Sequence, residues 1–106
     1  MPKYLMKASF TPEGIKGVLK DGGTGRRAAF DKSVVSVGGK LEAFYFAFGA
    51  SDTYSIVDLP SNADMVALAA TIVATGAVKI ETVVLLTPKE IDEASKKKVS
   101  YRPPGA

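Results

Sequence analysis

Two adjacent arginines, Arg26 and Arg27, follow the glycine-rich stretch Gly22–Gly25 and precede an apolar helical pattern. Glycines let a ligand approach the backbone closely, and a helix N-terminus offers free N–H groups and a positive dipole end. Two guanidinium groups at such a point can hold a carboxylate or a phosphate through paired hydrogen bonds. The stretch therefore predicts an anion-binding site formed by Gly25, Arg26 and Arg27, in which Arg26 is the stronger candidate.

A structural interpretation of the same stretch competes with this one. The arginines of a kinked helix can instead pair with Glu13, Asp21 or Asp31. Arg27 and Asp31 have i,i+4 spacing, which favours an ion pair for Arg27. The lysine and the serine or threonine of a nucleotide-binding P-loop are missing, so no site of that kind is predicted.

One carboxylate and three phenols are the other candidates for chemistry. Asp52 follows a glycine turn and can act as a base or a hydrogen-bond acceptor, although local turn bonding is favoured. Tyr45, Tyr54 and Tyr4 lie on predicted strands, and their hydroxyls can line a cavity between sheet and helices, although core packing is favoured. Asp52, Tyr45 and Tyr54 are thus the catalytic candidates, and Tyr4 joins the ligand-binding candidates.

Composition excludes several classes of site. The chain has 106 residues, of which 46% are hydrophobic and 24% charged, as expected for one globular domain spanning 1–106. It contains no cysteine and no histidine, which excludes disulfides, thiolate chemistry and histidine-based hydrolysis. We therefore expect no metal and no cofactor.

The net charge and the hydropathy of the chain limit the kinds of partner that we expect. The net charge of +3 is small for a dedicated nucleic-acid binder, and "FYFAFG" lacks the basic start of an RNA-binding strand. The longest uncharged run, Met65–Val78, is shorter than the ~20 residues of a membrane span. We expect a cytoplasmic protein with neither nucleic acid nor membrane as a partner.

Hydrophobic periodicity and capping residues place these candidates on a small set of elements. Strands are predicted at 3–10, 40–48, 52–59 and 78–86, and helices at 12–21, 26–37, from 61 or 62 to near 75, and at 89–98. Residues 99–106 are expected to form an extended tail because Pro103-Pro104 forbids a helix. The order βαββαβ followed by a helix is typical of the α+β class and its ferredoxin-like fold.

The strands carry apolar residues on both expected faces. In the strand at 40–48, one face holds Phe44, Phe46 and Phe48 and the other holds Leu41, Ala43, Tyr45 and Ala47. Helices can cover only one face of the sheet. The other face would then be an exposed apolar patch larger than soluble monomers usually carry. We expect a homodimer or higher oligomer that buries this face between copies. The alternative is a monomer whose C-terminal helix folds across it.

The segments "GRRAAFDKSVVSVGGKLEAFYFAFG" and "GAVKIETVVLLTPKEIDEA", with "YSIVDLP" between them, resemble the GYD domain family of small bacterial proteins. The resemblance runs from the first strand to the terminal helix. One position departs from it, because Ser51 stands where the family has the tyrosine of its naming motif, with Gly49 and Asp52 kept. The resemblance implies a ferredoxin-like fold that assembles as a dimeric α+β barrel.

Two functions are compatible with these residues. The first is a dimeric barrel that binds a small anionic or aromatic ligand through Arg26 and Arg27, without a cofactor. The alternative is a cofactor-free isomerase or monooxygenase-like enzyme that acts on a small aromatic or lactone substrate. The enzyme would need Asp52, Glu42 or a tyrosine as a proton donor or acceptor in a dry pocket.

Overall fold

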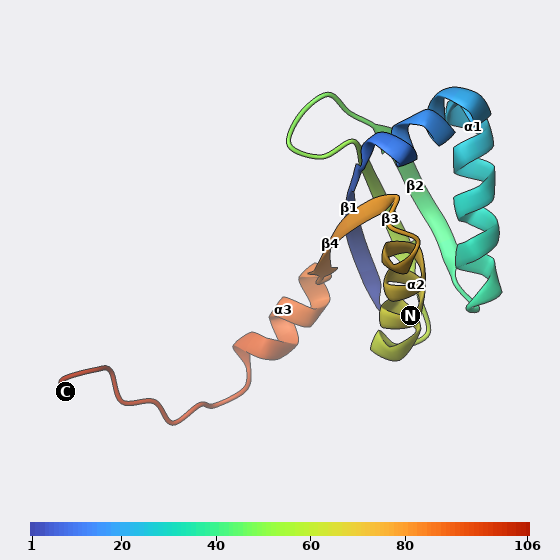
Figure 1. Ribbon diagram of the computed structural model, residues 1–106. Helices are drawn as coiled ribbons and strands as arrows, with labels where there is room; N and C mark the ends of the chain where they lie inside the picture. Colours follow the sequence, from blue (N-terminus) through green and yellow to red (C-terminus); the bar gives the residue numbers. More distant parts are fainter.

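The computed structural model describes all residues from 1 to 106 and confirms the predicted order of elements (Figure 1). The elements are β1 (Lys3–Phe10), α1 (Pro12–Ser36), β2 (Lys40–Phe46), β3 (Thr53–Asp58), α2 (Asn62–Ala74), β4 (Val78–Leu85) and α3 (Pro88–Ser95). The fold is α+β, and its order is that of a ferredoxin-like fold.

The four strands form one antiparallel sheet in the order β2-β3-β1-β4. Helices α1 and α2 pack on the same face of this sheet (Figure 1). The buried core lies between them and the central strands β1 and β3, and consists of Tyr4, Met6, Val34, Val57, Leu59, Met65 and Leu68. The other face of the sheet has no helix over it, and we call it the open face.

Short capping sequences start each helix where the pattern predicts. The Thr11 side chain accepts a hydrogen bond from the backbone N–H of Gly14, and Pro12 follows it. Ser61 caps α2 by accepting from the N–H of Asp64. Thr87 and Glu90 form a reciprocal capping box at the start of α3. These caps fix the points at which the chain leaves the sheet.

A kink in α1 replaces the predicted break between two helices. Gly22 has φ 75° and ψ 168°, a conformation that glycine adopts without strain, and the chain is helical on both sides of it. Gly23 lies against the ring of Phe46, where a Cβ would approach the ring to 3.2 Å. The kink turns the second segment of α1 so that it runs along the sheet.

The prediction that Leu41 shares a face with Ala43 and Tyr45 is wrong. A bulge between Leu41 and Ala43 adds one residue to β2 relative to β3, so the alternation of side chains changes phase there. Leu41 pairs with buried Val57 and packs against the core, whereas Ala43 pairs with Ile56 on the open face. The predicted faces of Phe44 and Tyr45 are unaffected because both follow the bulge.

Helix α3 does not fold across the open face. It leaves the end of β4 and projects from the body, and residues 96–106 continue without helix or strand and end in a turn at Pro104 and Gly105 (Figure 1). No residue of α3 is buried. None of the helices combines the length and the apolar character that crossing a bilayer demands.

Candidate functional site

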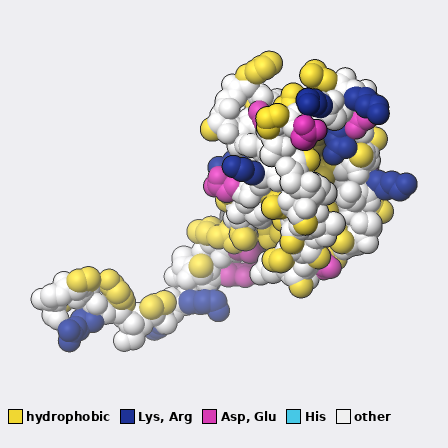
Figure 2. Space-filling view, in the orientation of Figure 1, with side chains coloured by type: hydrophobic (Ala, Val, Ile, Leu, Met, Phe, Trp, Pro, Cys, Tyr) yellow, Lys and Arg dark blue, Asp and Glu magenta, His cyan; other side chains and the backbone are white.

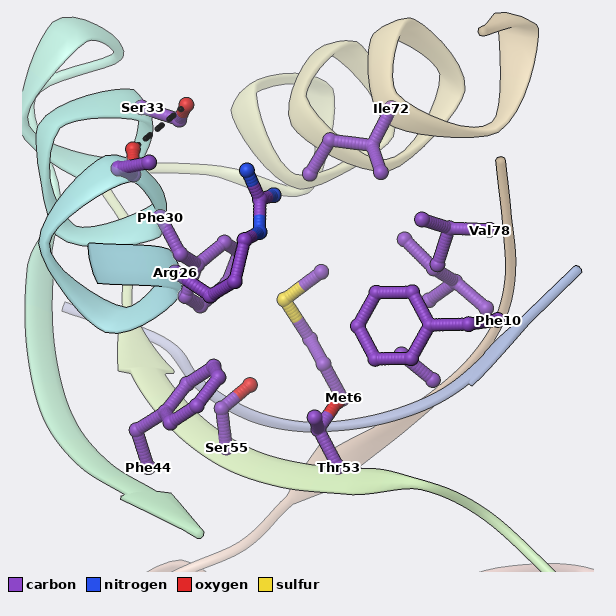
Figure 3. Close-up of a pocket in the computed structure, with 13 residues that line it drawn as sticks. Met6, Phe10, Arg26, Phe30, Ser33, Phe44, Thr53, Ser55, Ile72 and Val78 are labelled. Atoms are coloured by element: carbon purple, nitrogen blue, oxygen red, sulfur yellow. Dashed lines mark hydrogen bonds between the residues drawn. The ribbon is translucent and has the colours of Figure 1, made fainter. Parts of the chain in front are cut away.

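A cavity of about 210 Å³ lies between the sheet and the two helices that cover it. Nine of its thirteen lining residues are hydrophobic, and they come from all four strands, α1 and α2. Figure 3 shows β-strand side chains such as Met6 and Thr53 beneath the space and helix side chains above it. An apolar cavity of about 150 Å³ holds a benzene molecule, so this one is large enough for a substituted ring.

Arg26 brings a positive charge to this otherwise apolar cavity. It lies on the stripe of α1 that also carries Phe30, Ser33 and Val34, because residues four, seven and eight apart share a helix face. Its side chain projects from α1 into the space between the helices (Figure 3), with 35% of its surface exposed. Its one ion pair joins Nη1 to Asp21 Oδ2 at 3.4 Å, which leaves most of its donors free.

Two aromatic rings form one wall of the cavity. The ring centroids of Phe30 on α1 and Phe44 on β2 are 5.8 Å apart, with planes tilted by 45°. Phe46 continues the cluster with an edge-on contact to Phe44 at 5.3 Å. This geometry is favourable between aromatic rings and offers a flat apolar surface to a ligand.

The floor of the cavity carries two buried hydroxyls on β3. Thr53 is 4% exposed and Ser55 is 3% exposed, and both line the cavity. Neither hydroxyl has a hydrogen-bond partner within the chain. Because no fully buried side-chain polar atom lacks a partner, the two hydroxyl oxygens must reach the accessible space of the cavity. Buried hydroxyls ordinarily find a partner, so this pair can bind a polar group that enters the cavity. Ser33 contributes a third hydroxyl, which donates to the carbonyl of Ala29 at 3.2 Å.

The other residues of the glycine-arginine stretch lie outside the cavity. Arg27 and Gly25 are exposed and do not line it. Arg27 forms no ion pair, so the predicted alternative pairing with Asp31 is not present. Of the two arginines, the structure therefore brings only Arg26 to the cavity.

Asp52 lies in the β2–β3 loop and has a structural hydrogen bond. Its Oδ2 accepts from the backbone N–H of Phe10 at 2.8 Å, and its own N–H donates to the carbonyl of Ala8. These bonds tie the loop to the end of β1. Asp52 lines a separate shallow groove beside Phe48 and does not reach the cavity.

The tyrosine candidates also lie away from the cavity. Tyr45 pairs with Tyr54, and Tyr54 pairs with Lys7, which places all three on the open face. Tyr4 is 1% exposed on the helix-covered face, but it lines a groove beside α2 instead of the cavity. Asp52, Tyr45 and Tyr54 therefore do not meet one another at the cavity.

Replacing Tyr4 with phenylalanine separates its structural contribution from a role in binding. The Tyr4 hydroxyl donates to Asn62 Oδ1 and so joins β1 to the start of α2. Loss of this bond is expected to lower the free energy of unfolding by about 1 kcal/mol, measured by urea denaturation. Affinity for a cavity ligand is expected to stay within about twofold. A larger loss of affinity would return Tyr4 to the binding site.

The open face combines an apolar row with flanking charges. Ala43, Ile56, Leu5 and Val83 are adjacent across the four strands. On one side of this row, the ammonium of Lys3 binds Glu42 and, at 2.8 Å, Asp58. These hydrogen bonds, first that of Asp58 and then that of Glu42, raise the pKa of Lys3 above its ordinary value.

Lys7 and Glu81 form the ion pair on the other side of the apolar row, at 3.4 Å. The open face is therefore less uniformly apolar than the sequence predicts, because paired charges border its apolar centre. The pairing also means that each flanking charge already has a partner on the same surface.

The two hydroxyls on the cavity floor were missed as candidates from the sequence. The signal lies in the period-two pattern of the strand Thr53–Asp58, in which Thr53 and Ser55 share a phase with the core residues Val57 and Leu59. Polar residues in the buried phase of a strand point to a hydrogen-bonding role in the interior. Phe30 and Phe44 also line the cavity and were not among the candidates from the sequence.

The structure holds no group of three or more acidic, histidine or cysteine side chains that could bind a metal ion. Among protein families, the model of the GYD domain matches residues 4–95 of the 106-residue chain. No curated protein and no solved structure matched the chain. The match covers β2, β3, β4 and all three helices in full and β1 from its second residue, and the chain therefore belongs to the GYD domain family.

Proposed function

We propose that this protein binds a small aromatic or apolar carboxylate in the cavity between its sheet and helices. The observation that carries the proposal is the position of Arg26, a cation with one long ion pair, at an apolar cavity floored by two unpartnered hydroxyls. The apolar part of the ligand lies against Phe30 and Phe44. The carboxylate accepts from the guanidinium of Arg26.

The physical balance of the site favours an anion with an apolar body. A guanidinium that is partly shielded from water binds a carboxylate through two parallel hydrogen bonds. The surrounding hydrophobic residues supply affinity through buried area but few polar contacts. The hydroxyls of Thr53 and Ser55 can pair with a single polar substituent on the ring.

We favour binding over catalysis because the candidate proton-transfer residues do not converge on the cavity. Asp52 bonds to the backbone at another site, and Tyr45 and Tyr54 lie across the sheet from the cavity. An isomerase or monooxygenase would need such a group within hydrogen-bond reach of its substrate.

We also propose that two copies pack through their open faces as an α+β barrel dimer. The apolar row of Leu5, Ile56, Ala43 and Val83 supports this arrangement, since it has no covering layer in one copy. The Lys7–Glu81 pair is compatible with it because its charges cancel, and in the cluster of Lys3 with Glu42 and Asp58 each charged group has a partner within its own copy, although the cluster has one carboxylate more than ammonium.

Benzoate is a probe of suitable size for the proposed site. A ligand of about ten heavy atoms in a well-formed pocket is expected to bind with a Kd between tens of micromolar and a few millimolar. Isothermal titration with benzoate, with neutral benzamide as the matched probe, measures the contribution of the charge. We expect benzoate to bind at least about tenfold more tightly than benzamide.

Substitution of Arg26 by methionine tests whether the Arg26 guanidinium binds the carboxylate of the ligand. It preserves the apolar stem and removes the guanidinium, and we expect benzoate affinity to fall about 10- to 100-fold. Arg27→Met, one residue away and outside the cavity, is the matched control and is expected to bind as the wild type does. Equal losses in the two variants, or no binding of aromatic carboxylates to the wild type, would refute the proposal.

A further inference from the structure

The segment 87–106, which we call the C-terminal arm, leaves the body without packing on it. In Figure 1 it projects on the side of the molecule opposite α1. Three large apolar side chains of the arm are widely exposed: Ile91 at 53%, Val99 at 82% and Tyr101 at 73%. Figure 2 shows hydrophobic side chains spread along the arm between basic groups.

The chain exposes more surface than a lone folded protein of its size. Its accessible surface is 7411 Å², whereas a compact monomer of 11.1 kDa exposes about 5,700 Å². Its radius of gyration is 17.1 Å, against about 13 Å for a compact domain of this length. The arm that projects from the body accounts for the elongated shape, and its surface is available to a partner.

Local capping interactions favour helix α3, although none of its residues is buried in its own copy. The capping box of Thr87 and Glu90 and the proline at its first position favour the helix locally. A helix of eight residues is nevertheless marginal in water on its own. Its apolar side, which carries Ile91 and Ala94, therefore gains most from contact with a second molecule.

The open face alone is too small to hold two copies together. Four strands about 4.8 Å apart, with about six residues each, make a face of roughly 20 by 20 Å. Two such faces bury roughly 800 Å², which is less than the ~1,200 Å² of the smallest stable interfaces. Each docked α3 helix, about 12 Å long and 10 Å wide, buries its own surface and an equal surface of the body that it contacts. Two such helices add roughly 500 Å² of buried area. Arm and face together reach the range of a specific dimer.

We propose that the C-terminal arm of each copy packs on the body of a second copy that covers the open face. The inference rests on the proposed dimer and adds to it a reciprocal clasp, in which Ile91, Val99 and Tyr101 supply apolar contacts. The arm contributes to association and leaves the fold of its own body unaffected.

Paired substitutions on the arm test the clasp by sedimentation equilibrium of the full chain. Ile91→Glu combined with Tyr101→Glu is expected to raise the dimer dissociation constant at least about tenfold. Val35→Glu, at a residue of α1 that is 60% exposed, is the matched control and is expected to leave it unchanged. Because α3 has no buried residue, the double variant is expected to keep its circular dichroism spectrum.

A photo-crosslinker in place of Tyr101 identifies what the arm contacts. In a 1:1 mixture of 14N- and 15N-labelled chains, we expect crosslinked pairs in which one peptide carries 14N and the other carries 15N. Crosslinks within one isotope only would mean that the arm folds onto its own body, which overturns the clasp. A wild-type dimer whose dissociation constant the arm variant does not change would overturn the clasp and leave the face-to-face dimer standing. A wild-type monomer would overturn both.

Discussion

Phenylalanine in place of Ala8 is expected to abolish ligand binding while leaving the protein folded. Ala8 lines the cavity from β1, which lies in the interior of the sheet between β3 and β4. The new ring occupies the space of the ligand ring, since the cavity of about 210 Å³ has room for only one substituted ring. Burial of a phenyl group contributes about 1.5–3 kcal/mol, so the free energy of unfolding is expected to stay the same or to rise.

Fluorine NMR of 4-fluorobenzoate measures this loss directly. The signal of the probe is expected to broaden or shift with the wild type and to stay that of free probe with Ala8→Phe. The same substitution at Ala28, an exposed residue of α1 that does not line the cavity, is the matched control. An Ala8→Phe protein that binds the probe as tightly as the wild type would place the ligand elsewhere.

Alanine in place of Gly14 is expected to cost about 3 kcal/mol of folding stability. A Cβ at this position would lie 2.2 Å from the carbonyl oxygen of Ala77 and 3.1 Å from Cδ1 of Phe10. The carbonyl cannot easily move, because it accepts a hydrogen bond from the N–H of Thr11 at 3.0 Å. The first turn of α1 and the chain before β4 can therefore meet only when this residue has no side chain.

Gly17 provides a matched control for this prediction. It lies three residues further along α1, and a Cβ there would meet nothing within 4 Å. Gly17→Ala is expected to stabilise the protein by about 0.5–1 kcal/mol, because alanine is the better helix former. Urea denaturation followed by circular dichroism gives both values. Similar effects of the two substitutions would contradict the close approach at Gly14.

The fold could be predicted from the sequence because its local signals agree with one another. Thr11-Pro12 and Thr87-Pro88 mark helix starts, and the alternation in 3–10 marks a strand with one buried face. The bulge after Leu41 could not be predicted, because both Leu41 and Ala43 are apolar and the pattern does not show where the phase changes. Only the pairing with β3 reveals it.

The site could be predicted only in part. Arg26 was found because arginines near glycines at a helical segment attract anions, and its place on the stripe with Phe30 brings it to the cavity. Asp52 and Tyr45 were selected for their chemistry alone, and their surroundings depend on pairings between distant segments. The cavity itself arises where α1, α2 and the sheet leave space between them, which no local pattern encodes.

The most direct test of the account is a crystal structure of the protein with 4-fluorobenzoate. We expect the carboxylate within hydrogen-bond distance of the Arg26 guanidinium, and the ring beside Phe30 and Phe44 in the cavity. A probe bound at Arg27, on the open face or in the groove beside Asp52, with the cavity unoccupied, would contradict the account.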